Sequence, residues 1–285
     1  MPAPRCLYTL LFAPRERFDG LLLDEVAPLA RALRAEPGFE SLFFVRFSEP
    51  EWQLRFRVLG DPAWIAGSVQ PRVTAMVDAL AARGAVTAHR YAEYDREYER
   101  YGGAEGMRLA EALFTLDSFA AFDLLTAERA GGLARSRREW SVLAVERLLD
   151  LAGFTPAQRL AIYAHGYTWA LEDGAWSDED VRVLERRFEA LEPGLRELVF
   201  GDLDARARWG GEAAAGIANA WLAQAGPVVA DIMAGLADGR IAQQREYLFW
   251  SYAHMMTNRL GIESAGEAVL RFFLHRLWMN ALQRT

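Results

Sequence analysis

Two arginines in a strand-like segment are the first residues whose types and spacing suggest chemistry. Arg55 and Arg57 alternate with apolar residues within 52–59. Because successive side chains of a strand point to opposite faces, both guanidiniums are expected on one face. Paired guanidiniums bind carboxylates through bidentate hydrogen bonds. A solvated sheet face fits the same pattern, and all 32 basic residues are Arg, so a single Arg carries little information.

A charged and aromatic run, YDREYERYGG, occupies residues 94–103. If the strand predicted over 85–98 continues to the glycines, Tyr98 and Arg100 share one face. Paired glycines permit positive φ or a close approach of the backbone. The pattern is equally compatible with one wall of a polar pocket and with a solvated edge strand that ends in a turn.

A polar stripe runs along the helix predicted over 243–260. Tyr247, Ser251, His254 and Asn258 follow helical spacing, while the other positions are largely apolar. A histidine in such surroundings is suited to general acid or base catalysis. A hydrogen-bonded core histidine is the alternative. The other three histidines are expected at the surface or in packing contacts.

The elements that must position these residues form an α+β fold. An N-terminal antiparallel or mixed sheet with helices is followed by a mainly helical C-terminal half. Pro and Gly mark the ends of the segments, and Asp19 is expected to cap the first helix. We treat 1–285 as a single domain with a candidate internal boundary near residue 130. The expected strands are 6–13, 41–47, 52–59 and 85–98, and the expected helices are 21–35, 62–84, 104–128, 135–152, 155–172, 177–191, 211–236, 243–260 and 264–282.

The composition argues against several classes of function. A net charge of −7 disfavours nonspecific nucleic-acid binding, and a single cysteine, Cys6, excludes a disulfide framework. Motifs for nucleotides, NAD and zinc are lacking, so we expect no cofactor and no metal. No segment reads as a signal peptide or reaches about 18 uncharged apolar residues, so we expect a cytoplasmic protein without membrane contact.

Four segments together resemble a known family. They are Leu7 to Phe12, the hairpin with Phe43 to Phe47 and LRFR at 54–57, EYERYGG at 97–103 followed by 114–118, and HM at 254–255 with NRLG at 258–261. In this order they resemble the C-terminal, elimination domain of class I lantibiotic dehydratases. That domain also occurs alone, in thiopeptide-type bacteriocin biosynthesis. Gln53 and the sequence Phe47-Ser48-Glu49 depart from the family's usual hairpin.

The resemblance implies a lyase acting on a ribosomally made precursor peptide. A separate glutamylating dehydratase subunit esterifies Ser or Thr using glutamyl-tRNA, and this domain eliminates glutamate to leave dehydroalanine or dehydrobutyrine. A homodimer is a candidate assembly. Either hairpin arginine, with Arg100, would hold the glutamyl group and the oxyanion. The implied catalytic residues are Arg55, Arg100 and His254, and the implied substrate-binding residues are Arg57, Tyr98, Ser251 and Asn258.

Two alternatives belong to other classes. The fold is shared with pyridine synthases, which join two dehydroalanines in a formal [4+2] cycloaddition with loss of the leader peptide. A non-catalytic scaffold that binds the peptide or its glutamylating partner is the other. Both arginine sites and the histidine are retained, which favours elimination, because cycloaddition has no glutamate to bind.

Overall fold

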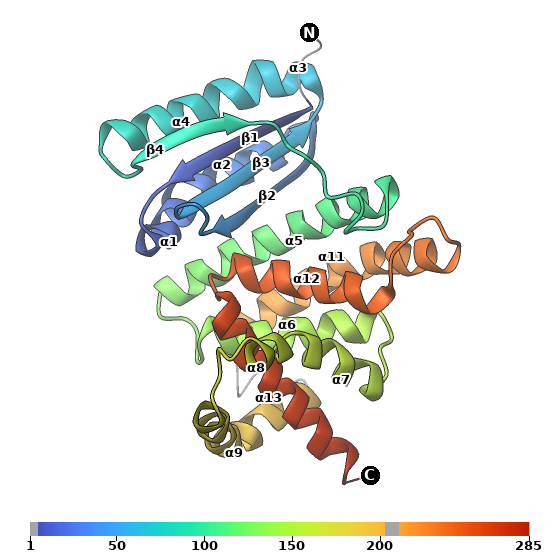
Figure 1. Cartoon of the computed structure of the whole chain (residues 1–285). Helices are drawn as coiled ribbons and strands as arrows, with labels where there is room; N and C mark the ends of the chain where they lie inside the picture. Colours follow the sequence, from blue (N-terminus) through green and yellow to red (C-terminus); the bar gives the residue numbers. More distant parts are fainter. Residues whose placement is uncertain (1–4, 203–210, 285) are drawn as a thin grey trace.

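A four-stranded antiparallel sheet stands against a larger helical half (Figure 1). The computed structural model describes residues 5–202 and 211–284. The strands are β1 (Cys6–Phe12), β2 (Phe39–Phe47), β3 (Gln53–Gly60) and β4 (Ala88–Ala92), in the order β2-β3-β1-β4. The predicted α+β class is therefore confirmed, with every strand pair antiparallel.

The two faces of the sheet differ in character. Leu54, Phe56 and Val58 of β3 are fully buried in the main core. Helices from the N-terminal part cover that face: α1 (Phe18–Leu21) continues through a π-helical turn into α2 (Ala27–Arg34), and α3 (Pro62–Trp64) continues likewise into α4 (Gln70–Ala82). The other face carries the β3 arginines beside a small cluster of Tyr8, Leu10 and Phe12.

The helical half begins with α5, which lies along β2 and also packs on α11. This helix ends at Arg129, and the internal boundary near residue 130 stays a prediction. The helices are α5 (Ala104–Arg129), α6 (Arg137–Leu151), α7 (Pro156–His165), α8 (Thr168–Glu172), α9 (Asp178–Phe200), α11 (Glu212–Ala237), α12 (Arg245–Arg259) and α13 (Ser264–Leu282).

Three expectations about helices were wrong. The helix predicted over 155–172 is divided near Gly166, where a Cβ atom would lie 2.6 Å from Cγ of Arg271. The helix predicted to end at 191 continues through Pro193 to Phe200, because Leu195, Leu198 and Val199 are buried. Asp19 caps no helix: it lies within α1, and its carboxylate accepts hydrogen bonds from Arg46 and Arg137.

The outer edge of β2 is closed by side chains from the helical half. Backbone N–H groups of an edge strand lack a partner strand at every second residue. Here the N–H of Leu42 donates to Thr115 Oγ1 at 3.2 Å and that of Phe44 to Ser118 Oγ at 3.4 Å, both on α5. The N–H of Arg46 donates to Asn258 Oδ1 of α12 at 2.9 Å, and Asn258 Nδ2 returns a bond to the Arg46 carbonyl at 2.8 Å. The sheet is thereby bound to both helices.

One helix departs from the expectation that no segment could span a membrane. By length and composition α11 qualifies, with a mean hydropathy of 1.3 over its most apolar stretch, of which 28% is buried. Core helices of soluble proteins meet the same criterion, so this is weak evidence for a membrane span.

The edge bonds predict a stability difference between two threonines of α5. Thr115→Val leaves the Leu42 N–H without its acceptor, while the buried Ser41 hydroxyl keeps its bond to the Glu111 carbonyl, and we expect the change to cost about 1–3 kcal/mol. Thr126 bonds only the Phe122 carbonyl of its own helix and is exposed, so Thr126→Val should change stability by less than about 0.5 kcal/mol. Urea unfolding of both variants measures the difference, and equal losses would contradict the role given to the β2 edge.

Candidate active site

The hairpin arginines lie on one face of the sheet, as predicted, but in different surroundings. The Cζ of Arg57 lies 4.1 Å from the ring centroid of Tyr8 and 4.8 Å from that of Tyr94. Arg57 is 9% exposed, and its buried Nε has no hydrogen-bond partner among the described residues. Arg55 lies 3.4 Å from the Phe47 ring centroid. Burial lowers the pKa of Arg55, and the positive charge of Arg57 adds to this effect. Both cations are held by aromatic rings.

The segment after β4 does not continue as a strand, so the shared face expected for Tyr98 and Arg100 does not form. The chain leaves the sheet after Ala92 and turns tightly over 98–102. Two contacts fix its path instead: Tyr94 packs edge-on against Tyr8 of β1 and Phe43 of β2, so the segment crosses the sheet face, and Arg96 then pairs with Glu111 of α5 at 2.7 Å.

The glycine pair has the role expected of it. Gly102 and Gly103 have φ values of 76° and 104°, which favour glycine. A Cβ atom on Gly102 would also lie 2.6 Å from Cγ2 of Ile241. The glycines therefore permit a turn that lies close against the segment preceding α12.

Arg100 is positioned by this turn rather than by a strand. Its Nε donates to Ser251 Oγ on α12 at 3.3 Å, and its Nη1 lies 3.0 Å from Glu97 Oε2. Burial opposes the charged form, but the neighbouring Tyr101 and Glu97 raise the pKa of Arg100. Glu97 also acts on the charge of Arg55. Our sequence interpretation missed Glu97, because the charged run offers three acidic residues with no pattern that separates them.

His254 is held by a buried carboxylate that the sequence interpretation also missed. Its Nδ1 lies 2.7 Å from Glu267 Oε2 on α13, and Arg271 donates to Glu267 Oε1 at 2.9 Å. Burial alone would raise the pKa of Glu267, but the His254 hydrogen bond and the Arg271 charge lower it to about 2. An ionised carboxylate only accepts, so Nδ1 donates and Nε2 is left for a substrate. The i, i+4 spacing of Glu267 and Arg271 was the available signal.

The three other predicted site residues differ in how deeply they are buried. Ser251 is fully buried beneath Arg100. Asn258 lines the same pocket as His254, although both ends of its amide already bond β2. The Tyr98 side chain is 46% exposed at the surface of the turn.

A buried ion pair lies behind the arginine face. Arg259 of α12 is fully buried, and its Nη1 lies 3.6 Å from Asp117 Oδ2 of α5. Burial lowers the pKa of Arg259 to about 10 and raises that of Asp117 to about 6. Trp221 and Ser118 bond the pair from either side. The positive charge of Arg57 acts on Arg259, so Arg259 adds a second cation beneath the arginine face.

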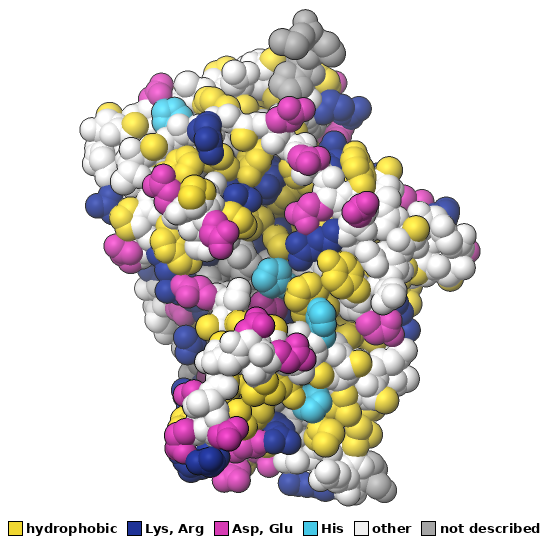
Figure 2. Space-filling view, viewed as in Figure 1, with side chains coloured by type: hydrophobic (Ala, Val, Ile, Leu, Met, Phe, Trp, Pro, Cys, Tyr) yellow, Lys and Arg dark blue, Asp and Glu magenta, His cyan; other side chains and the backbone are white. Residues whose placement is uncertain are grey.

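These groups define what the site can do. Arg55 and Arg57 from β3, Arg100 from the turn and His254 from α12 provide three cations and an oriented imidazole. Figure 2 shows this face of the molecule hollowed where the sheet meets the helical half, with Arg and His side chains gathered there. Within the described residues no group of three or more His, Cys, Asp or Glu side chains is arranged to hold a metal ion. The arrangement suits anion binding combined with proton transfer.

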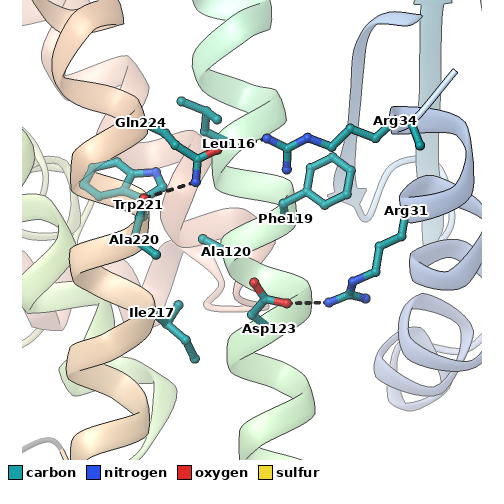
Figure 3. A pocket seen from close by; sticks show the side chains of 11 residues that line it. Arg31, Arg34, Leu116, Phe119, Ala120, Asp123, Ile217, Ala220, Trp221 and Gln224 are labelled. Atoms are coloured by element: carbon teal, nitrogen blue, oxygen red, sulfur yellow. Dashed lines mark hydrogen bonds and ion pairs between the residues drawn. The ribbon is translucent and has the colours of Figure 1, made fainter. Parts of the chain in front are cut away.

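A separate pocket of about 310 Å³ lies between α2, α5 and α11 (Figure 3). Arg31 pairs with Asp123 there, and Arg34 donates to Gln224 Oε1 at 2.9 Å. Its cations are thus already satisfied by the protein, and it contains none of the predicted site residues.

Solved structures with this fold support the architecture. The tRNA-dependent lantibiotic dehydratase MibB from Microbispora sp. 107891 superposes with a TM-score of 0.78 at 23% identity, over 100% of this chain and 29% of that one. TsrL (TM-score 0.69, 18% identity) covers 98% of this chain and 95% of its own. The pyridine synthase TbtD from thiomuracin biosynthesis superposes with a TM-score of 0.69 at 15% identity. The match spans 99% of this chain and 100% of TbtD. At these identities the likeness establishes the fold alone.

Sequence relatives point in the same direction. The subtilin biosynthesis protein SpaB of Bacillus subtilis is 26% identical over 56% of this chain and 15% of its own length. The nisin biosynthesis protein NisB of Lactococcus lactis subsp. lactis is 28% identical over 44% of this chain and 12% of its own length. The chain thus matches less than a sixth of the length of these relatives. A family model described as lantibiotic biosynthesis dehydratase C-term matches residues 7–278, and the chain therefore belongs to that family.

Proposed function

We propose that this protein eliminates glutamate from glutamylated Ser or Thr residues of a precursor peptide. The proposal is carried by the Arg100 turn and α12: Arg100 Nε bonds Ser251 Oγ, and the carboxylate-oriented His254 follows Ser251 by three residues on the same helix. Arg55 and Arg57, on one face of β3, supply two further cations. A glutamyl ester presents a carboxylate for the cations and an acidic Cα proton for the base.

In the elimination, each of these residues would have a separate role. His254 Nε2 removes the Cα proton of the esterified residue, and a cation stabilises the developing oxyanion on the adjacent carbonyl. The electron pair forms the Cα=Cβ bond as the Cβ–O bond breaks, and glutamate leaves as a carboxylate. Arg55 or Arg57, with Arg100, holds the glutamyl group. Glu97 anchors Arg100 through their ion pair, so we assign it a positioning role.

A dehydratase component outside these residues would supply the glutamylated peptide. MibB is described as a tRNA-dependent lantibiotic dehydratase, and this chain covers 29% of its length. We infer that the glutamylation reaction and its tRNA contacts belong to a dehydratase component outside these 285 residues. The net charge of −7 on this chain fits that division of roles, because tRNA is itself a polyanion.

Pyridine synthesis is the second candidate, favoured by one specific observation. The pyridine synthase TbtD covers this chain almost end to end and is itself covered completely. Cycloaddition of two dehydroalanines, however, gives the three cations no carboxylate to bind. We therefore place elimination first.

The two reactions are separated by offering purified protein two peptides in turn. We expect a glutamylated peptide to yield free glutamate and a product lighter by one glutamic acid, detected by mass spectrometry. Turnover only of a peptide containing two dehydroalanines, with a pyridine absorbance, would contradict elimination and support cycloaddition. Binding of either peptide without turnover would indicate the non-catalytic scaffold.

Removal of the base or of a cation should abolish elimination without unfolding the protein. We expect His254→Ala and Arg100→Ala each to lower kcat/KM by at least about 100-fold. Arg108→Ala is the matched control, because Arg108 is exposed on α5; its kcat/KM should stay within about twofold. Retention of full activity by His254→Ala would remove His254 from the mechanism.

Glu267 should stabilise the protein in a pH-dependent way. Its pKa falls from an ordinary 4.5 to about 2 on folding, so its contribution is complete above pH 4.5 and is lost as the pH falls toward 2. We expect Glu267→Gln to lose about 3 kcal/mol at pH 7, and less as the pH falls below 4.5. Urea unfolding between pH 3 and 7 measures this loss.

Glu197→Gln, a change at an exposed position of α9, provides the control for the pH series and should show no such dependence. The same series tests the link to function, because Glu267→Gln should lower kcat for elimination more than it changes KM. A pH-independent stability loss in Glu267→Gln would contradict the ionised state assigned to Glu267.

A further inference from the structure

Two adjoining pockets lead away from His254, first between the β2–β3 hairpin and α13 and then between the starts of α6 and α13. The pockets, of about 430 and 460 Å³, are both lined by Arg15, Gly261, Ile262 and Glu263. Because they share these four residues, the two pockets adjoin, and we call the pair of them the entry groove. Its inner end is lined by His254 and its outer end by Arg138.

The inner end of the entry groove meets the candidate active site. Phe47 lines this end together with His254, and the Arg55 guanidinium stacks on the Phe47 ring at 3.4 Å. A chain that lies in the groove therefore arrives beside the base and one of the cations. The groove is in the right place to hold residues next to the one that reacts.

The walls of the groove offer both apolar contact and hydrogen-bond donors. Trp52 is held edge-on by Phe18, at 6.0 Å between ring centroids, and lines the inner end. The first turn of α13 lines both parts of the groove through Ser264, Ala265 and Gly266. The side chain before this turn, Glu263, pairs with Arg15 and makes no capping hydrogen bond. The N–H groups of that turn therefore remain available to carbonyl or carboxylate oxygens.

Two charged side chains along the groove, Glu49 at the inner end and Arg138 at the outer end, have no ion-pair partner among the described residues, while the other arginines of the lining are paired. Arg46 pairs with Asp19, Arg137 pairs with Asp19 and Glu128, and Arg15 pairs with Glu263. Arg138 is exposed, and within residues 5–202 and 211–284 it has no ion-pair partner. Its positive charge favours an acidic side chain on whatever occupies this end.

We propose that the entry groove binds an extended segment of the precursor peptide, adjacent to the modified residue, that carries an acidic side chain at the Arg138 end. An extended chain presents carbonyls to the α13 turn and a side chain to Trp52. The inference rests on the proposed function for the identity of the peptide, but the binding it predicts does not require turnover.

The test measures binding of two fluorescein-labelled synthetic peptides that lack any glutamyl ester. One is a 12-residue peptide with a central Ser flanked on both sides by Asp and Glu residues, and the other has each acid replaced by its amide. Anisotropy titrations with full-length protein should show tighter binding of the acidic peptide. Arg138→Glu should lower the affinity for the acidic peptide by about 3- to 10-fold and leave the affinity for the neutral peptide unchanged. Trp52→Phe should lower the affinity for both peptides, because it removes contact area while it preserves an aromatic ring.

Arg108→Glu is the matched control, since it reverses an exposed charge on α5 outside both pockets. Its affinity for the acidic peptide should stay within about twofold. Equal losses in Arg138→Glu and Arg108→Glu would show only a general effect of net charge and would overturn the proposal. Unchanged affinity in both Arg138→Glu and Trp52→Phe would also overturn it. Failure of the proposed function would appear differently, as normal peptide binding by the wild-type protein with no glutamate released from a glutamylated peptide.

Discussion

The closed outer edge of β2 is the constraint on which the rest of the structure depends. An edge strand packed against helices must satisfy its free N–H groups, or lose about 1–3 kcal/mol for each that is left buried and unpaired. Hydroxyls of α5 and the Asn258 amide of α12 meet that need residue by residue. The sheet can therefore neither slide along α5 nor rotate away from α12. This registration fixes β2, and with it the paired strand β3 that carries Arg55 and Arg57, relative to the helix that carries Ser251 and His254.

A second consequence of this docking is that the site holds positive charge before any substrate arrives. Arg57 is surrounded by aromatic rings instead of carboxylates, and Arg259 lies behind it in full burial. Ring faces stabilise a guanidinium while leaving its hydrogen-bond donors free. Under the proposed function, a substrate carboxylate would pair with Arg57, whose charge is held by rings, whereas the charge of Arg259 is already opposed by Asp117.

Local patterns predicted those parts of the site that lie within one element. Alternation placed Arg55 and Arg57 on one face, and helical spacing placed Ser251 and His254 on one stripe. Local patterns could not predict contacts between segments that are far apart in the sequence. The strand after Ala88 was predicted too long, since its end depends on the packing of Tyr94 and on Glu111, which lies on α5. Arg100 reaches Ser251 across 151 positions, and Glu267 meets His254 only because α13 packs beside α12.

The most direct measurement is a crystal structure of the protein with a peptide in which an amide replaces the glutamyl ester, so that elimination is blocked. The account predicts that the glutamyl side-chain carboxylate lies within hydrogen-bond distance of Arg100 and of Arg55 or Arg57. It also predicts that the Cα hydrogen of the modified residue faces His254 Nε2. A glutamyl group bound away from all three arginines, or a Cα hydrogen that points away from His254, would contradict it.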